Sequence, residues 1–479
     1  PKWLTKAFHA AGTVPKDNAV KSMKVTPLSL DPLAGDALGG SSIKVRLDLE
    51  YETPDAELHT KLFGKMPLVP TDVCERFEHH KWFMDEAEVM FNRLLGPACP
   101  FRVPKTYFAD HNVESTNFIH LVEWIEYTDE WEPKKPWVVA KANQKVFDSE
   151  IPKLGIERYM ALFRSLASFV AAFQTDQLGD KRRLAQCFEG VEMALNEKSS
   201  PWPHSEEEWG SLQAMAASKE YQDSIVGQAE GAANLSQFQM QVGVDFALNC
   251  CPQLFPKECV EPKFMLSFLQ EVMHFQQYNV EVNWFLTQYP ELFSLFHPNT
   301  QLDNGYYMYE DEGCTIMEAG IFDWAKVACM PYIGSMAGNL QSGAECELVE
   351  EHEEGLIRYW LDSYHASGGS QRLTFDLVHR CFKLAFCTCV PGTMGFINNV
   401  LKDTPKTDPF WKKVKSFNSP EIETTFMKRV NIGGIVHMLQ AWRSPKRRLY
   451  ASFLEWCQQH AQVVFERPFP SSLSLPKPK

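Results

Sequence analysis

The chain has 479 residues, of which 44% are hydrophobic, 23% charged and 13% aromatic. These proportions are typical of a soluble globular protein with a large core, and they exclude a fully disordered chain. The formal net charge is −14, which lacks the basic excess of nucleic-acid-binding proteins, so we expect no nucleic-acid partner. The length allows two or three domains, or one two-lobed domain with insertions.

The 13 cysteines are scattered from Cys74 to Cys457, without the C-x-x-C pairs of a zinc site or the regular spacing of a disulfide framework. We therefore expect reduced thiols, which favours a reducing compartment such as the cytoplasm or an organelle interior. No apolar run reaches the roughly 18 residues of a membrane-spanning helix, so we predict no transmembrane segment.

The first part of the chain is predicted to be rich in strands. Residues 1–30 are mixed and polar, which indicates an N-terminal arm or a short helix. The stretch Ile43–Tyr51 then alternates apolar and charged residues, the pattern of a strand with one buried face. Residues 31–125 form a predicted β-rich N-terminal lobe, with further strands near 58–66, 103–109 and 117–124 and one helix over 72–95.

The remainder, residues 126–465, is predicted to be a mainly helical C-terminal lobe after a linker near 124–136. An apolar stripe from Tyr159 to Phe173 has the spacing of a long helix. Two short apolar runs, 293–296 and 314–322, indicate a strand hairpin inside this lobe. A loop or insertion is expected over 187–261, helices over 262–288 and from 350, and a loose C-terminal tail over 466–479. The predicted fold class is a two-lobed α+β protein.

Phosphoryl transfer requires a small-residue turn over the phosphates, a strand lysine and a helix glutamate that holds the lysine. The turn candidate is Gly39-Gly40-Ser41-Ser42, the lysine is Lys65, and the glutamate is Glu88. Lys61 competes with Lys65 and Glu86 with Glu88. Taken singly, each feature is equally typical of an ordinary hairpin turn or a surface charge.

The most informative constellation lies between residues 297 and 324. His297, Asn299 and Asn304 have the spacing H-x-N-x-x-x-x-N directly after an apolar run, and the following run ends in Asp323-Trp324. A hairpin that brings Asn304 and Asp323 together supplies two oxygen ligands for Mg²⁺, which is usually held by one or two carboxylates plus phosphates. The alternative is an ordinary polar loop followed by a strand-terminal aspartate.

These residues resemble the superfamily of aminoglycoside phosphotransferases, choline kinases and ecdysteroid kinases. Its motif is H-G-D-x-x-x-x-N, followed by a strand that ends in D-W or D-F. The chain matches at His297, Asn304, Asp323 and Trp324, and it departs at Pro298 and Asn299. The order of Gly39–Ser42, Lys65-Met66-Pro67 and Glu88-x-x-Phe91 is also similar to the ecdysteroid-kinase-like branch, and the resemblance covers roughly residues 30–400.

The resemblance implies a protein-kinase-like fold with ATP between the lobes. The adenine would meet the linker at Glu123, Trp124 and Ile125, while Lys65 would contact phosphates and pair with Glu88. By the same resemblance, Asn304 and Asp323 would hold Mg²⁺, His297 would support the catalytic loop, and Asn299 would occupy the base position. The acceptor would be a small molecule that offers a hydroxyl group.

Because the base position holds an asparagine, two functions remain possible. Its amide can orient a hydroxyl but cannot take its proton, and general-base catalysis typically supplies about 10²–10⁴ in rate. One hypothesis is a slow ATP-dependent kinase, with Asp303 as a substitute base nearby. The other is a pseudokinase, a nucleotide-binding or structural subunit with a protein partner.

Overall fold

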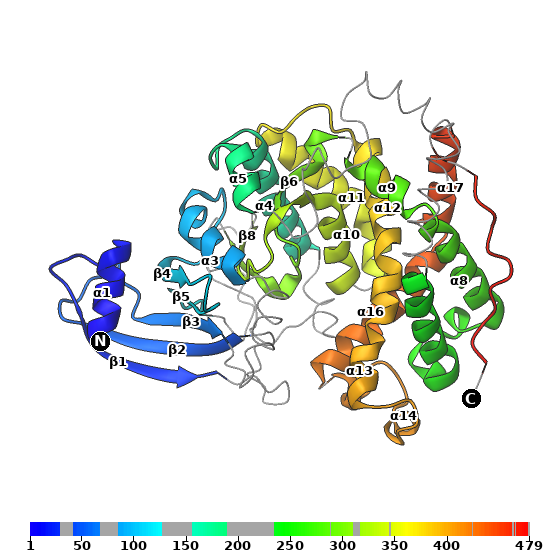
Figure 1. Cartoon of the computed structure of the whole chain (residues 1–479), viewed down its shortest axis with the longest axis horizontal. Coiled ribbons are helices and arrows are strands. Elements are labelled where there is room, and N and C mark those ends of the chain that lie inside the picture. Colours follow the sequence, from blue (N-terminus) through cyan, green and yellow to red (C-terminus); the bar gives the residue numbers. More distant parts are fainter. Residues whose placement is uncertain are drawn as a thin grey trace.

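The structure is a computed structural model that describes residues 1–28, 42–67, 85–126, 156–188, 234–287, 289–309, 317–343, 346–423, 425–461, 464 and 466–477. The chain forms a small lobe built on one antiparallel sheet and a large lobe that is mainly helical (Figure 1). This is the two-lobed α+β arrangement that the sequence predicts.

The small lobe contains a five-stranded sheet in the order β1-β2-β3-β5-β4, with antiparallel pairing throughout. The predicted strand over 43–51 is confirmed as β2, and the helix ending near residue 95 is confirmed for its described part, α3. The bounds are α1 (Lys2–Ala11), β1 (Val20–Pro27), β2 (Ser42–Tyr51), β3 (Lys61–Pro67), α3 (Asp85–Leu94), β4 (Thr106–His111) and β5 (Phe118–Glu123).

The two faces of this sheet have different roles. Val45, Leu47, Leu62 and Leu121 belong to a buried cluster with Leu4 and Phe8 of α1. Gly64 lies on the same face, where an added Cβ would stand 2.7 Å from a methyl carbon of Val45. Because successive strand residues point to opposite faces, Lys44, Arg46, Phe63 and Lys65 lie on the other face, toward the large lobe.

Residues 1–28 belong to the small lobe: the short helix that the sequence offered is confirmed as α1, whereas the alternative of a separate arm is not what the structure shows. Strand β1 pairs with β2 along its whole length, and α1 buries Leu4, Ala7 and Phe8. The sequence did not predict strand β1, because residues 21–25 of this strand are exposed and show no apolar alternation.

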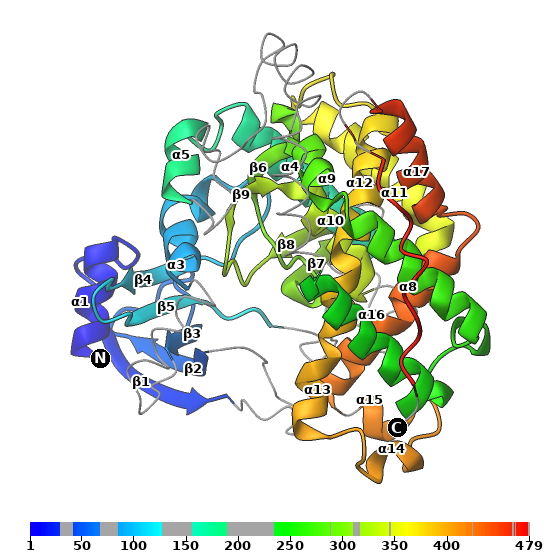
Figure 2. The same ribbon diagram turned by 45° about the vertical axis from the view of Figure 1, so that its right-hand side comes forward.

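The large lobe is organised around α4 (Glu157–Gln174), most of whose side chains are buried. Two short sheets, β6–β9 and β7–β8, lie on the side that faces the small lobe (Figure 2). Their bounds are β6 (Phe293–Phe296), β7 (Gly305–Tyr309), β8 (Met317–Ile321) and β9 (Ala328–Pro331). The predicted strand at 293–296 is therefore confirmed, and the run over 314–322 contains β8. The two runs do not form the predicted hairpin with each other, because β6 pairs with β9 and β8 pairs with β7.

The remaining helices pack around α4 and one another in a single large core. The insertion predicted over 187–261 falls mostly outside the described residues, but residues 234–250 are helical. The bounds are α5 (Lys181–Cys187), α8 (Pro262–Gln276), α9 (Asn279–Thr287), α10 (Tyr332–Gly343), α11 (Cys346–Ala366), α12 (Phe375–Gly395), α13 (Ile397–Asp403), α14 (Phe410–Lys413), α15 (Pro420–Glu423), α16 (Phe426–Arg443) and α17 (Leu449–Gln459).

One stretch among the described helices, Phe375–Asp403, is long and apolar enough to cross a membrane. It comprises α12 and α13, and Phe382, Phe386 and Val390 are fully buried within the large lobe. The core helix of a globular domain has this composition too, so the stretch alone identifies no membrane span. The eleven cysteines of the described residues are all free thiols, as predicted.

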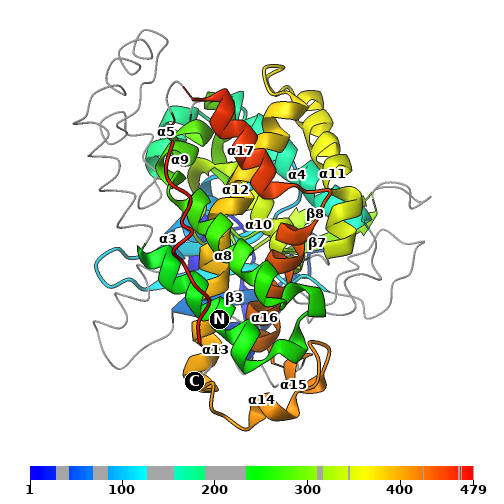
Figure 3. The same cartoon turned by 90° about the vertical axis from the view of Figure 1, so that its right-hand side faces the viewer.

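The C-terminal segment is not the loose tail that its Pro/Ser-rich composition predicts. Residues 466–477 run along α8 (Figure 3). Gln270 Nε2 donates hydrogen bonds to the carbonyl oxygens of Ser471 and Leu473 at 3.3 and 3.2 Å. Arg467 pairs at 2.5 Å with Glu281, whose side chain is fully buried. Regular secondary structure is absent from this segment, yet side-chain contacts fix it.

The Arg467–Glu281 pair gives a test of this docking. We expect Arg467→Ala to lower the free energy of unfolding by about 3 kcal/mol, because it leaves a buried carboxylate without a counter-charge. The matched control is Arg448→Ala, which breaks an exposed pair with Glu455 and should cost about 1 kcal/mol or less. Urea unfolding measures both, and equal effects would contradict the assignment.

Candidate functional site

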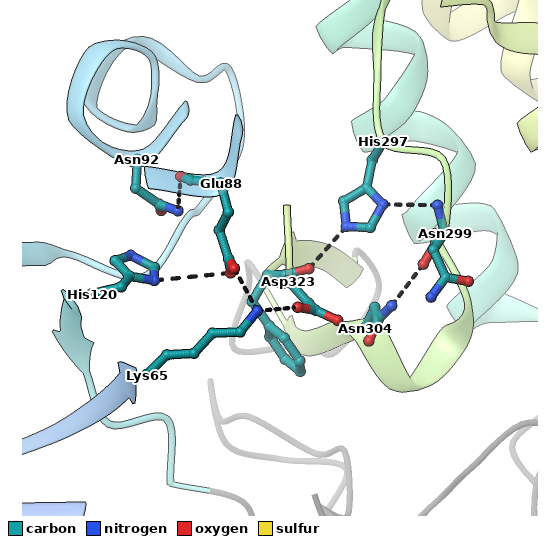
Figure 4. A network of polar contacts seen from close by, with 9 residues as sticks. Lys65, Glu88, Asn92, His120, His297, Asn299, Asn304 and Asp323 are labelled. Carbon is teal, nitrogen blue, oxygen red and sulfur yellow. Dashed lines mark hydrogen bonds and ion pairs between the residues drawn. The ribbon is translucent and has the colours of Figure 1, made fainter. Parts of the chain in front are cut away.

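A buried ion pair joins the sheet to α3. Lys65 Nζ on β3 lies 2.5 Å from Glu88 Oε2, and both side chains are 6% exposed. Asn92 Nδ2 donates to the Glu88 carbonyl oxygen at 2.8 Å (Figure 4). The two competitors lie elsewhere: Lys61 pairs with Glu126, and Glu86 lies 4.0 Å from His111. The structure thus brings together the lysine and the glutamate that the sequence preferred.

Lys65 also reaches the large lobe. Its Nζ lies 3.1 Å from Oδ1 of Asp323. Asp323 is the second residue after the end of β8. Asp323 has a left-handed backbone with φ of 61°, a conformation that Asp tolerates better than most residues. The charge of Lys65 outweighs burial and lowers the pKa of Asp323 well below its usual range. The carboxylate is therefore ionised at neutral pH.

His297 ties the loop after β6 to the segment that carries Asp323. His297 Nε2 lies 3.0 Å from the Phe322 carbonyl oxygen, and the Asn299 N–H donates to His297 Nδ1 at 3.1 Å. Since Nδ1 accepts, Nε2 carries the proton and donates. Burial lowers the pKa of His297, so the ring is neutral. This agrees with the supporting role that the family resemblance implies for it.

Asn304 closes the same loop from its other end. Its Nδ2 donates to the Asn299 carbonyl oxygen at 2.7 Å, and its own carbonyl oxygen accepts from the Phe322 N–H at 3.1 Å. Asn304 and Asp323 therefore sit on adjacent chain segments, as Figure 4 shows. The side chain of Asn299 is exposed. The side chain of Asp303, the alternative base, lies outside the described part of the chain.

Trp324 fixes the position of α3, a role that the sequence motif did not reveal. Its ring stacks on Phe91 with centroids 3.7 Å apart and planes at 11°, and it lies 5.3 Å from Phe169 of α4. Phe91 follows Glu88 by three residues, so both side chains lie on one face of α3. The residue after Asp323 thus holds the helix that supplies Glu88.

The linker residues line a cleft of about 840 Å³ between the lobes. Glu123, Trp124 and Ile125 form one side of it, and Tyr306 and Met308 of β7 contribute from the large lobe. The Glu123 carboxylate lies 3.3 Å from His59 Nε2. The linker positions expected to meet an adenine therefore do face a cavity, although Lys65 and Asp323 are not among its lining residues.

Phe63 is a second residue that sequence reasoning missed. It precedes Lys65 by two positions on β3, so it lies on the same face of the sheet. Its ring centroid is 6.5 Å from that of Trp124, and the Arg46 guanidinium lies 5.8 Å from the same indole ring. The sequence could have indicated Phe63, because side chains two positions apart on a strand lie on the same face as each other. An aromatic surface therefore lies between the linker and the lysine.

The predicted phosphate turn falls largely outside the described residues. Gly39, Gly40 and Ser41 lie there, whereas Ser42 is the first residue of β2 and is completely buried. Its hydroxyl has no hydrogen-bond partner among the atoms that the structure places.

His120 completes the surroundings of the ion pair. It lies directly opposite Lys65 on β5, and its Nδ1 is 3.9 Å from Glu88 Oε1. Burial, reinforced by the charge of Lys65, lowers the pKa of His120 to about 3. A neutral imidazole therefore stands behind the Lys65–Glu88 pair.

Comparison with known proteins gives only distant neighbours. No family model and no curated protein matches the chain. Among solved structures it is similar to a candidate aminoglycoside phosphotransferase from Ralstonia eutropha, with 10% identity, a TM-score of 0.38, and coverage of 88% of this chain and 92% of that chain. A choline/ethanolamine kinase family protein from Mesorhizobium loti has 12% identity, a TM-score of 0.35 and coverages of 93% and 97%.

The ethanolamine kinase of Plasmodium vivax has 10% identity, a TM-score of 0.34 and coverages of 85% and 81%. These neighbours carry names from the superfamily that the motifs resemble. Their similarity to this chain is distant.

The neutral state of His120 predicts a pH dependence of stability. Its pKa is lower in the folded protein than the ordinary value of 6.5, so at lower pH the unfolded chain binds a proton that the folded protein does not. The contribution of His120 to stability is thus complete above about pH 6.5 and decreases as the pH falls below that value. Between about pH 7 and about pH 5.5, we expect wild type to lose about 1 kcal/mol more than His120→Met.

Urea unfolding of both proteins at the two pH values measures this difference. Equal losses in the two proteins would show that folding does not lower the pKa of His120.

Proposed function

We propose that the chain is an ATP-dependent phosphotransferase that acts on a hydroxyl group of a small molecule, and that Asn299 makes it slow. The observation that carries the proposal is the double contact of Lys65, with Glu88 in its own lobe and with Asp323 in the other. A buried lysine held by two carboxylates is costly to build for packing alone, since each charge must be desolvated. The arrangement would serve to bind the phosphates of a nucleotide through Lys65.

The nucleotide would lie between the lobes. Lys65 neutralises charge on the phosphates while Glu88 keeps its ammonium group in place. The aromatic surface of Phe63 and Trp124 offers a stacking face for a base at the linker. Arg46, stacked near Trp124, is paired with Asp48 at 3.2 Å, which holds it beside that surface.

Asn304 and Asp323 fit a magnesium ion. The Asp323 side chain is 44% exposed although one of its oxygens contacts Lys65, so a carboxylate oxygen remains accessible. The hydrogen bond from Asn304 Nδ2 fixes that amide and leaves its oxygen as an available ligand. Oxygen ligands from one carboxylate and one amide are a suitable protein contribution for Mg²⁺. Held by Asn304 and Asp323, the ion would neutralise negative charge on the phosphates.

Asn299 sets the rate in this proposal. Its exposed amide oxygen can accept a hydrogen bond from the acceptor hydroxyl and orient it toward the phosphates. It cannot hold the proton that the hydroxyl loses. Positioning, Lys65 and the metal site remain, and these supply much of the rate in phosphoryl transfer. The expected enzyme is therefore impaired at a single step.

The second candidate function is a pseudokinase, and the amide at position 299 is the observation that favours it. The same Lys65, Asn304 and Asp323 would then bind nucleotide without turnover, and the chain would act through a protein partner. Nucleotide binding is common to both functions, whereas phosphate transfer separates them.

Nucleotide binding is tested by thermal unfolding with and without ATP and Mg²⁺. We expect MgATP to raise the unfolding temperature of wild type, because a ligand that binds only the folded state stabilises it. Asp323→Ala should lose the magnesium-dependent part of the shift. Asp110→Ala, an exposed carboxylate of the small lobe, is the matched control and should retain the shift. A wild type without any shift would contradict the kinase and the nucleotide-binding form of the pseudokinase, and would leave only a structural subunit.

Turnover is tested by ATP consumption with a panel of small alcohols and amino alcohols as acceptors. We expect Asn299→Asp to raise the rate by roughly 10²-fold, because it restores a proton acceptor. Wild-type turnover that Asp323→Ala abolishes would exclude the pseudokinase. Absence of turnover in both wild type and Asn299→Asp, with MgATP bound, would favour it.

A further inference from the structure

Two adjacent cysteines, Cys250 and Cys251, lie at the end of a helix in the large lobe. The helix over residues 234–250 ends in a wide turn, in which the Cys251 N–H donates to the carbonyl oxygen of Phe246, five residues back, at 3.0 Å. Cys251 then leaves the helical conformation, with φ of −141° and ψ of 54°, because Pro252 disfavours that conformation in the residue before it. Wide turns of this kind are rare in helices and frequently lie at functional sites.

This change of backbone direction brings the two thiols into contact. Successive side chains on a regular helix or strand do not face each other, so adjacent cysteines in such elements hold their sulfur atoms apart. Here the Cys251 thiol donates to Cys250 Sγ at 3.7 Å, and Cys250 Sγ lies 3.8 Å from the carbonyl oxygen of Lys406. The end of the helix therefore presents a dithiol.

The two thiols differ in exposure and in reactivity. Cys250 is partly exposed, whereas Cys251 is completely buried. The hydrogen bond from Cys251 lowers the pKa of Cys250, and the charge of Lys406 adds to this effect, although burial opposes it. The same hydrogen bond, together with burial, raises the pKa of Cys251. Because the thiolate is the nucleophile, Cys250 is the thiol that reacts first.

We propose that Cys250 and Cys251 form a redox modification site, at which a low-molecular-weight disulfide oxidises the dithiol to a disulfide between adjacent residues. The Cys250 thiolate attacks one sulfur of the small disulfide and expels one small thiolate, which leaves a mixed disulfide on Cys250. Cys251 then loses its proton and attacks the Cys250 sulfur, and the second small thiolate leaves. The two protons of the dithiol end on the two released thiols, so the protein is oxidised as the small disulfide is reduced.

The product is of the kind that is easily reversed. Consecutive Cα atoms are about 3.8 Å apart, which is below the usual range of about 4.4–6.8 Å for disulfide-bonded residues. The bond between Cys250 and Cys251 is therefore strained, and strain makes a disulfide easier to reduce. Labile disulfides of this class serve regulation more than structure. The inference uses no residue of the proposed nucleotide site and does not depend on the proposed function.

The experiment measures the mass of one peptide. Trypsin releases residues 220–257, which contain Cys250 and Cys251 and no other cysteine. The reduced native protein is treated with glutathione disulfide, and the remaining thiols are then alkylated in denaturant before digestion. We expect this peptide to be about 2 Da lighter than its reduced form and to carry no alkyl group, since the dithiol has lost two hydrogen atoms. Dithiothreitol should restore both thiols.

Three variants test the order of the two steps. Cys251→Ser should stop the reaction with one glutathione on Cys250, because the second attacking thiol is missing. Cys250→Ser should leave Cys251 unmodified, because that thiol is completely buried. The matched control is Cys187→Ser, which removes an exposed cysteine of α5 and should form the disulfide as wild type does.

The mass of the wild-type peptide decides the inference even if a variant fails to fold. A wild-type peptide that keeps both thiols, that retains glutathione, or that is linked to another peptide would overturn it.

Discussion

The ion pair between Lys65 and Glu88 is the interaction on which the site depends, because it fixes three elements at once. The lysine comes from the sheet, the glutamate from α3, and Asp323 joins them from the large lobe. Each charge is tolerated in its surroundings only because the others are present. The neutral His120 behind the pair adds no competing charge. The two lobes are thus joined where Lys65 contacts Asp323.

Aromatic packing gives that ion pair its geometry. Trp324 follows Asp323 in the chain and stacks on Phe91 of α3, so the segment that carries Asp323 and the helix that carries Glu88 share one contact. His297 joins the segment from the other side through its bond to the Phe322 carbonyl. A ring stack and a hydrogen bond together leave Asp323 little freedom. Preorganised groups of this kind avoid reorganisation when a charged ligand arrives.

Predictions from the sequence were reliable where a pattern is local. The alternation of residues 43–51 predicted β2, and the apolar stripe of 159–173 predicted α4. The candidate residues Lys65, Glu88 and Asp323 are in contact in the structure, and their role as a site stays a prediction. The predictions were wrong where composition was the only signal. The polar strand β1 pairs with β2, and the Pro/Ser-rich segment after residue 466 is docked by Arg467 and Gln270. Such segments are ordered by contacts with distant residues.

The sequence by itself determined which chemical groups are present, including the amide at position 299, on which the proposals of a slow kinase and of a pseudokinase both rest. Only the tertiary structure decided between Lys65 and Lys61, and between Glu88 and Glu86, because a strand or helix pattern does not state which side chain meets another element. The structure alone also placed Lys44, Phe63 and His120 around the pair. Which residues face each other across strands, and which are buried, is decided only when the sheet assembles. The sequence alone therefore does not show which distant residues become neighbours.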